Sequence, residues 1–201
     1  MLQKADRTGL VMENKEIYNQ LSEKKIGRKD IYEGVIAHLV VDKVLLPNGN
    51  TSTREVILHN GAVCVVPITD DGEIIMERQF RYPFDSVIWE IPAGKLDKNE
   101  KSPLEGAMRE LREETGYVAS NYKFIGLYYP SPAILSEKIY MYVATGLTAG
   151  ERELDDDEFL DVVKVPFDKV VDMILDGEIP DGKTQTAVLK AKVLMDRDQL
   201  R

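Results

Sequence analysis

Residues 93–117 constrain the fold of this chain more than any other stretch, because they combine a glycine-containing loop with a strongly marked helix. Ser102 is a suitable N-cap, Pro103 fits the first helical position, and Glu105 completes an S-x-x-E capping box. Gly116 stands where a left-handed C-terminal stop is favoured. These signals predict a helix that begins directly after Ser102 and ends directly before Gly116.

The predicted helix carries an apolar stripe and, beside it, a group of carboxylates. The stripe should face a core and consists of Leu104, Ala107, Met108 and Leu111. Glu110, Glu113 and Glu114 lie close together and repel one another unless a cation compensates them. Most acidic helix faces are simply solvated, but hard oxygen ligands at this spacing suit Mg²⁺ or Mn²⁺. The glycine loop, the caps and the glutamates together favour a metal site.

This stretch resembles the Nudix box, whose usual form is G-x5-E-x7-R-E-U-x-E-E-x-G-U with U apolar. The matching residues are Gly94, Glu100, Arg109, Glu110, Leu111, Glu113, Glu114, Gly116 and, loosely, Tyr117. One spacing departs from the pattern, because eight residues instead of seven separate Glu100 from Arg109. We place the extra residue in the loop before Ser102, which leaves the role of Glu100 open. The resemblance implies an α/β Nudix fold, with a mixed β-sheet sandwiched between helices, and a metal-dependent hydrolase.

The composition is that of an ordinary globular protein, and the net charge limits the kinds of partner that the chain is expected to bind. The chain has 201 residues, 43% of them hydrophobic and 30% charged, which allows one sizeable core plus a subdomain. Its net charge of −9 argues against a dedicated nucleic-acid or anionic-membrane binder. The single cysteine, Cys64, lies in an apolar run and should be buried. Since neither a membrane span nor a signal peptide is recognisable, we expect a cytoplasmic protein.

Two domains are expected, and the first comprises residues 1–60. A polar arm at residues 1–30 precedes a small antiparallel β subdomain. Residues 31–46 predict one long or two short strands, residues 47–50 a turn, and residues 53–59 the returning strand. Because so small a sheet is marginal alone, it should pack on the main domain or on a second subunit.

Residues 61–201 are expected to form the main, Nudix domain. A nearly all-apolar run at residues 61–68 predicts a strand covered on both faces. Further strands, which imply a mixed sheet, are predicted at residues 73–81, 87–91, 122–128 and 138–144. Amphipathic helices are predicted at residues 168–175 and 183–195. Residues 177–184 match the P-loop pattern but follow a segment of helical periodicity, so we interpret them as a connection between helices.

Four further features resemble the ADP-ribose pyrophosphatase branch of the Nudix family. They are the N-terminal β subdomain, the runs at residues 78–81 and 90–94, the segment 131–137, and the acidic run at residues 155–158. The resemblance implies hydrolysis of ADP-ribose, and of other ADP-sugars, to AMP and ribose 5-phosphate. It also implies Mg²⁺ as cofactor, with Mn²⁺ as a substitute, and a homodimer that holds adenine across its interface.

The resemblance assigns a role to each matching residue. The metal ligands that it implies are Ala93, through its carbonyl, Glu110, Glu114 and Glu158. The catalytic residues that it implies are Glu113, Glu158, Asp156 and Arg109. Glu113 would bind or steady a further ion, and Arg109 would orient the glutamates by bidentate pairing. The choice between Glu158 and Asp156 as the base that takes a proton from water stays open.

Substrate contacts are implied at four further positions, namely Arg54, Arg81, Glu137 and Pro132. Arg81 would hold the pyrophosphate, Arg54 the adenosine side, and Glu137 the terminal ribose. As an alternative, Arg78 and Arg81 can be ordinary charges on a strand surface. Two other functions stay open from the sequence: hydrolysis of a different nucleoside diphosphate sugar or a dinucleotide, and a non-catalytic module that binds ADP-ribose.

Overall fold

The computed structural model describes residues 15–154 and 158–200. The chain divides into two compact units. The first comprises Met1–His59 and Ala133–Leu135, and the second comprises Asn60–Pro132 and Ser136–Arg201. In the described part of the chain, no helix is both long enough and apolar enough to cross a membrane.

From residue 15 onward, the N-terminal unit forms a three-stranded antiparallel sheet. A helical segment at residues 15–21 precedes β1 (Lys24–Glu33), β2 (His38–Leu45) and β3 (Thr51–Leu58), which lie in the order β1-β2-β3. The turn between β2 and β3 is where the sequence predicts it. Strand β1 begins within the stretch predicted as a polar arm, and that part of the prediction is wrong. Its side chains are mostly exposed, so no apolar alternation marks the strand, and pairing with β2 defines it.

The described residues of the second unit form two sheets. The mixed sheet has the order β7-β4-β9-β8 and consists of β4 (Ala62–Pro67), β7 (Ala93–Lys95), β8 (Tyr117–Tyr128) and β9 (Ile139–Ala149). Strands β4 and β9 run parallel, and the other pairs are antiparallel. The antiparallel sheet has the order β10-β5-β6 and consists of β5 (Glu73–Arg81), β6 (Ser86–Glu90) and β10 (Leu160–Pro166). The predicted strands are present, but they divide between two sheets.

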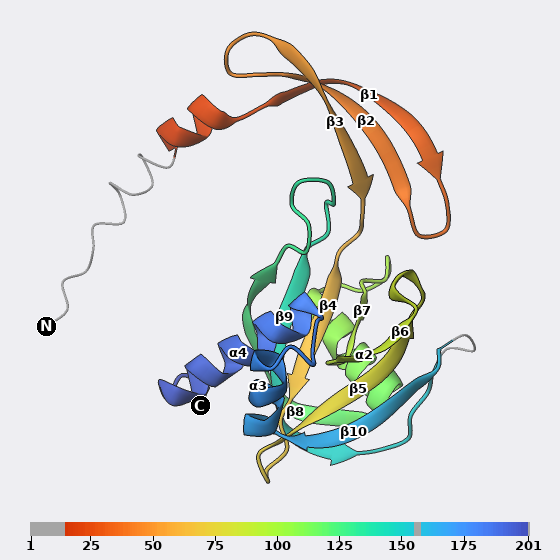
Figure 1. Cartoon of the computed structure of the whole chain (residues 1–201), viewed down its shortest axis with the longest axis vertical. Coiled ribbons are helices and arrows are strands. Elements are labelled where there is room, and N and C mark those ends of the chain that lie inside the picture. The colour runs from red at the N-terminus through yellow and green to blue at the C-terminus, as the bar shows by residue number, and fades with distance from the viewer. Residues whose placement is uncertain (1–14, 155–157, 201) are drawn as a thin grey trace, which may run out of the picture. The chain divides into compact units, whose positions relative to one another are not determined.

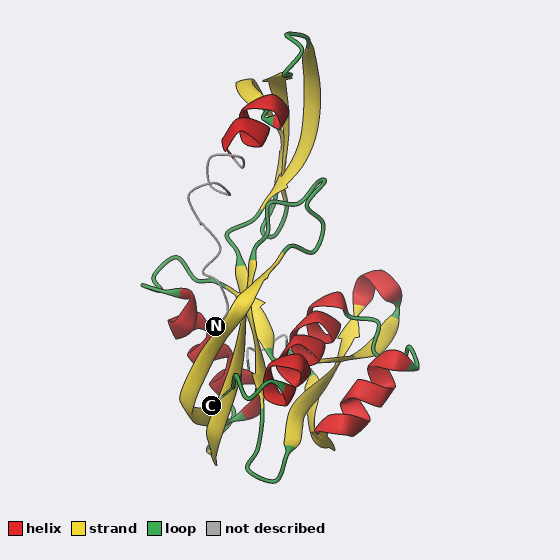
Figure 2. Cartoon of the chain, turned by 90° about the vertical axis from the view of Figure 1, so that its left-hand side faces the viewer, coloured by secondary structure: helices red, strands yellow, loops and turns green. Residues whose placement is uncertain are grey.

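Helices cover both faces of the mixed sheet. In the described part of the second unit the helices are α2 (Pro103–Thr115), α3 (Phe167–Leu175) and α4 (Gly182–Asp196), with the short 3-10 helix η1 (Tyr82–Phe84) between β5 and β6. Helix α3 packs against α4 and against β5 and β10 of the antiparallel sheet. Helix α2 packs against β4, β7 and β8, and α4 packs against β4, β8 and β9 (Figure 1, Figure 2). This confirms the predicted mixed sheet with helices on both faces.

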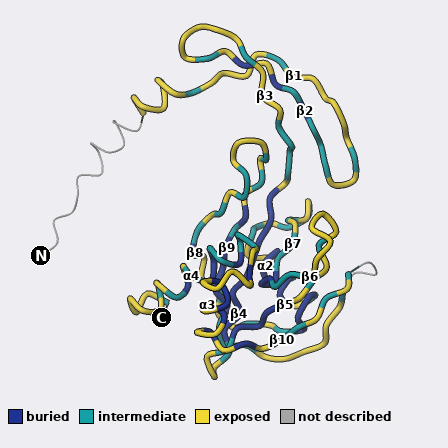
Figure 3. Tube along the Cα trace, in the orientation of Figure 1, coloured by how far each residue is buried: buried dark blue, intermediate teal, exposed yellow. Residues whose placement is uncertain are grey.

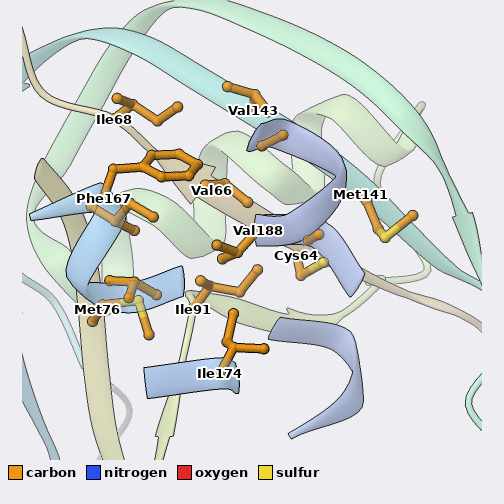
Figure 4. Close-up of a cluster of buried hydrophobic side chains, with 14 of the residues drawn as sticks. Cys64, Val66, Ile68, Met76, Ile91, Met141, Val143, Phe167, Ile174 and Val188 are labelled. Carbon is orange, nitrogen blue, oxygen red and sulfur yellow. The ribbon is translucent and has the colours of Figure 1, made fainter. Parts of the chain in front are cut away.

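Strand β4 is the centre of the core, and all six of its residues are buried (Figure 3). Val63 and Val65 pack in the cluster formed with α2. Cys64 and Val66 belong to the larger cluster on the opposite face, together with Val188 of α4 (Figure 4). The prediction of a strand covered on both faces is therefore confirmed. Burial raises the pKa of the Cys64 thiol to about 12, so this thiol is a packing group.

The P-loop-like run at residues 177–184 connects two helices, as predicted. Gly177 follows α3 with a left-handed φ of 80°. Asp181 then caps α4, because its side chain accepts a hydrogen bond from the backbone N–H of Thr184. A phosphate-binding loop requires a preceding strand, so this run is not one.

Thr184 fastens α4 to the end of β6, and its replacement by valine should destabilise the protein. Its Oγ1 accepts from Ile91 N at 3.0 Å and donates to Asp181 Oδ2 at 2.6 Å, and the residue is fully buried. Thr184→Val keeps the volume but leaves the buried Ile91 N–H without its acceptor. We expect the free energy of unfolding to fall by about 2 kcal/mol in urea titrations.

The matched control for this prediction is Thr186→Val, on the same helix at a partly buried position. That change should alter the free energy of unfolding by no more than about 0.5 kcal/mol. Equal effects of the two substitutions would contradict the anchoring role of Thr184.

Candidate active site

Helix α2 has the ends that its sequence predicts. The Ser102 hydroxyl accepts from Glu105 N, and Pro103 opens the helix. The Glu105 carboxylate returns to Lys101 N at 2.8 Å, one residue before the position that a capping box uses. Gly116 ends the helix with φ 75°, and its N–H donates to Arg112 O. These ends set the register of every glutamate on the helix.

The apolar stripe predicted for α2 is only half right. Leu104 and Met108 are 37% and 46% exposed. The buried arc of the helix consists of Gly106, Ala107, Glu110, Leu111, Glu114 and Thr115. A side chain on Gly106 would meet Leu96 and the Glu100 carboxylate, so the loop before the helix packs over this glycine. The helix therefore turns the side that carries Glu110 and Glu114 toward the protein interior, and part of its apolar stripe faces solvent.

Glu110 and Glu114 are held against the first two residues of β7, Ala93 and Gly94. The two glutamates are 7% and 4% exposed. Glu114 Oε2 accepts a hydrogen bond of 2.9 Å from Ala93 N. The Glu110 carboxylate lies against Gly94, where an added Cβ would overlap it. The glycine that opens the box is thus required by the close approach of a carboxylate to the backbone.

Arg109 ties the remaining acidic residues of the box together. Its guanidinium donates to Glu100 Oε1 and to Glu113 Oε2, each at 2.8 Å, and it lies 2.8 Å from Glu110 Oε1. It also donates to Lys95 O at 2.9 Å. Glu100 Oε2 accepts from a backbone N–H of its own loop. Glu100 therefore positions Arg109 and the loop despite the one-residue insertion.

The buried glutamates are surrounded by more negative than positive charge. Burial raises the pKa of Glu110 to about 7, even though Arg109 opposes the shift. Burial, and then the charges of Glu77 and Glu110, raise the pKa of Glu114 well above its usual range. The charge of Glu158 acts on both helical glutamates in the same direction. The site thus favours a proton, or a cation, on these carboxylates.

These pKa shifts predict that the metal-free protein loses stability as the pH rises. In an unfolded chain the pKa of a glutamate is about 4.3. A carboxyl whose pKa is raised by folding contributes stability that is fully present below its unfolded pKa. This contribution is lost as the pH rises through its folded pKa. For Glu110 the folded value is about 7. We expect the free energy of unfolding to fall by on the order of 3 kcal/mol between about pH 5 and about pH 9.

Urea unfolding with a chelator present, repeated over this pH range, measures the effect. The Glu110→Gln protein, which lacks one of the titrating groups, should show a smaller fall. A wild-type stability that does not change over the range would contradict the raised pKa values.

Arg81 pairs with a further buried acid, Glu90 of β6. Its Nε and Nη2 donate to Glu90 at 2.5 and 2.7 Å. Lys183 Nζ pairs with the same carboxylate and, at 3.0 Å, with Asp181. Although burial opposes it, hydrogen bonds from Arg81 and the charge of Lys183 hold the pKa of Glu90 below its usual value. Two cations thus balance two carboxylates in this network.

Four other residues that the sequence predicts for the site are Arg54, Pro132, Glu137 and Asp156. Arg54 belongs to the N-terminal unit, where it pairs with Glu23 and donates to Thr53 O. Pro132 is exposed, and Glu137 is half-buried, in the connection between β8 and β9. Asp156 lies outside the described residues. The roles assigned to these residues stay predictions.

Glu77 is a buried acid on the same strand as Arg81 that the sequence pattern does not single out. It lies on β5 and is 3% exposed. Burial, and then the charge of Glu90, raise its pKa to about 8. In the sequence it is the acid that directly follows the apolar run at residues 74–76 and precedes the charged run at residues 78–81.

The fold and this site define a class of α/β enzyme in which a carboxylate-bearing helix lies against a short strand that contains a glycine. The family model for the NUDIX domain matches residues 58–186. The chain therefore belongs to the Nudix family, and it is a Nudix hydrolase.

Two relatives and one solved structure cover most of the chain. An "ADP-ribose pyrophosphatase" of Bacillus subtilis (strain 168) is 44% identical over 170 residues, which are 84% of this chain and 91% of that protein. A "Methanol dehydrogenase activator" of Bacillus methanolicus is 44% identical over 168 residues, which are 83% and 90%. A crystal structure described as an ADP compounds hydrolase has a TM-score of 0.78 at 24% identity and covers 89% of this chain and 97% of that one, which shows the shared fold.

Nudix hydrolases generally use a divalent metal ion, and the donors present here suit one. Across residues 15–154 and 158–200, no three His, Cys, Asp or Glu side chains are already grouped as a ready metal-binding set. The chemistry of the donors nevertheless fits, because Glu110 and Glu114 are buried carboxylates with excess negative charge around them. Hard carboxylate oxygens are the ligands that Mg²⁺ and Mn²⁺ prefer.

Proposed function

We propose that this protein is a Mg²⁺-dependent pyrophosphohydrolase that cleaves ADP-ribose to AMP and ribose 5-phosphate. The observation that carries the proposal is the pair of buried glutamates, Glu110 and Glu114, on a Nudix helix that is intact in its caps and in all three helical glutamates. The relative that is named an ADP-ribose pyrophosphatase, aligned over most of both chains, supports the choice of substrate.

In this proposal Glu110, Glu114, Glu158 and the Ala93 carbonyl hold the ion. When bound, the ion neutralises charge on the diphosphate and lowers the pKa of water. Arg109 keeps Glu110 and Glu113 in place through its charge-assisted contacts of 2.8 Å. Glu113 steadies the ion site from the edge of the helix, where its side chain is 28% exposed. Its weaker burial suits an accessory role.

Arg81 binds the pyrophosphate in this proposal. Glu90 engages its Nε and Nη2 and leaves Nη1 for a phosphate oxygen. A guanidinium held on one edge by a buried carboxylate loses little freedom when it binds substrate, and its charge stabilises the leaving phosphate. Glu90 is thus the positioning residue for Arg81.

The base that takes a proton from the attacking water is a carboxylate of the acidic run at residues 155–158. Glu158 is the stronger candidate, because its charge acts on Glu77, Glu110 and Glu114. Asp156 is the alternative. Glu137 on the terminal ribose, Pro132 beside it and Arg54 on the adenosine complete the proposed substrate contacts.

A substrate panel tests the function. Purified protein with Mg²⁺ is given ADP-ribose, other ADP-sugars, other nucleoside diphosphate sugars and dinucleotides, and the products are separated by chromatography. We expect the highest kcat/KM for ADP-ribose, with AMP and ribose 5-phosphate as products. A higher value for another substrate class would replace ADP-ribose in the proposal. Tight binding of ADP-ribose without products would indicate a non-catalytic module instead.

A second candidate function follows from the relative that is named a methanol dehydrogenase activator. Its identity to this chain equals that of the pyrophosphatase relative. The test is the rate of a purified methanol dehydrogenase with and without this protein. An unchanged rate would exclude this activity toward the enzyme tested.

A homodimer and a cytoplasmic location remain predictions. Analytical ultracentrifugation of the purified protein tests the first of them.

A further inference from the structure

Glu77 is a buried carboxylate that the mechanism above does not use. It lies on β5, the central strand of its sheet, directly opposite Glu90 of β6. Side chains alternate along a strand, and Ile74 and Met76 belong to the apolar core cluster. Glu77 therefore shares the other face of β5 with Arg81, the face that carries the Arg81–Glu90 pair.

One oxygen of this carboxylate lacks a partner. Glu77 Oε1 is buried and has no hydrogen-bond partner among the residues that the structure describes. Leaving a buried acceptor unsatisfied costs about 1–3 kcal/mol, and more when the group is charged. Such a group on a central strand calls for an explanation, and a bound ion is one of them.

The nearby cations do not supply the compensation. Lys183 attracts Glu77, but its Nζ is already paired with Glu90 and Asp181. Arg81 is bound to Glu90. These two cations are matched by the two carboxylates they contact, so the network has no surplus positive charge for Glu77.

The remaining neighbours of Glu77 are carboxylates of the proposed ion site. After burial, the negative charge of Glu77 is the strongest influence on Glu114. Glu110 and Glu158 act on Glu77 in turn. A group of buried carboxylates with one unpartnered oxygen is a set of hard donors for a small divalent cation.

We propose that Glu77 is a further carboxylate of the divalent-cation site, binding the ion together with Glu114. This inference rests on the proposed metal-dependent function. Glu77 anchors the site from β5, whereas Glu110 and Glu114 belong to α2. The ion would thus join the antiparallel sheet to the helix that covers the mixed sheet.

Direct titration of metal-free protein with Mn²⁺, followed by electron paramagnetic resonance of the free ion, tests the proposal without turnover. We expect Glu77→Gln to weaken Mn²⁺ binding at least about tenfold. Glu77→Val should do the same and provides a second variant with a strand-favouring residue. Glu73→Gln, the same change on the same strand, should leave the affinity within about twofold of wild type, since Glu73 is the first residue of β5 and pairs with Pro166.

The outcomes separate the two proposals. If wild-type protein binds Mn²⁺ and both Glu77 variants bind it equally well, the role of Glu77 is wrong and the proposed function stands. If wild-type protein binds no Mn²⁺, both fail. A purely structural Glu77 would change the melting temperature of the variants and leave their Mn²⁺ affinity unchanged.

Discussion

A Glu114→Gln protein should lose turnover by on the order of 10³-fold at saturating Mg²⁺ and remain folded. The amide keeps the volume of the side chain and an oxygen that can accept from Ala93 N, as Glu114 Oε2 now does. It removes the charge that would hold the ion. Because burial and neighbouring carboxylates already raise the pKa of Glu114, a neutral group suits the metal-free fold. The melting temperature should therefore stay at or above that of wild type.

Steady-state hydrolysis of ADP-ribose and thermal unfolding measure the two halves of this result. The matched control is Glu105→Gln, the same change on an exposed glutamate in the first turn of the same helix. Its oxygen can still accept from Lys101 N, so turnover should stay within about twofold of wild type. Wild-type kcat in the Glu114→Gln protein would show that this carboxylate does not serve the reaction.

The candidate site was predictable from the sequence where the signals are local. The ends of α2 depend on contacts within a few residues, such as the Ser102 cap and the left-handed Gly116. The same holds for the turn that connects α3 to α4, where Gly177 and Asp181 act on neighbouring backbone groups. Local chemistry of this kind needs no knowledge of the tertiary fold.

The face of α2 that is buried was not predictable in the same way. Hydropathy places Met108 inside and Glu114 outside, and the structure reverses both. The reversal depends on Gly106 and on the loop that packs over it. A helix whose polar residues serve a site buries them against its own apolar pattern.

Partners that are distant in the chain were also beyond a sequence argument. The Lys183 contact to Glu90 joins residues 93 positions apart, and it requires α4 to lie beside the end of β6. Glu77 was overlooked for the same reason, since only the pairing of β5 with β6 brings it opposite Glu90. The start of strand β1 was not predictable from the sequence, because its exposed residues lack the alternation of apolar and polar side chains that burial of one face imposes.

A Gly94→Ala protein should fold and yet lose turnover by about 10²-fold. The structure gives Gly94 no left-handed φ, so the backbone tolerates alanine. The obstacle is space, because the new Cβ would overlap the Glu110 carboxylate. The end of a long side chain can move aside at modest cost, so we expect the melting temperature to change by only a few degrees. The displaced carboxylate would no longer stand where the ion site needs it.

The comparison that isolates this effect is Gly27→Ala on β1, where the added Cβ would meet Lys43 Cβ at an ordinary 3.7 Å. That protein should match wild type in both kcat and melting temperature. Gly94→Ala and Glu110→Gln should also be non-additive, because both remove the same carboxylate from its position. A double variant that loses the product of the two single effects would mean that Gly94 acts through something other than Glu110.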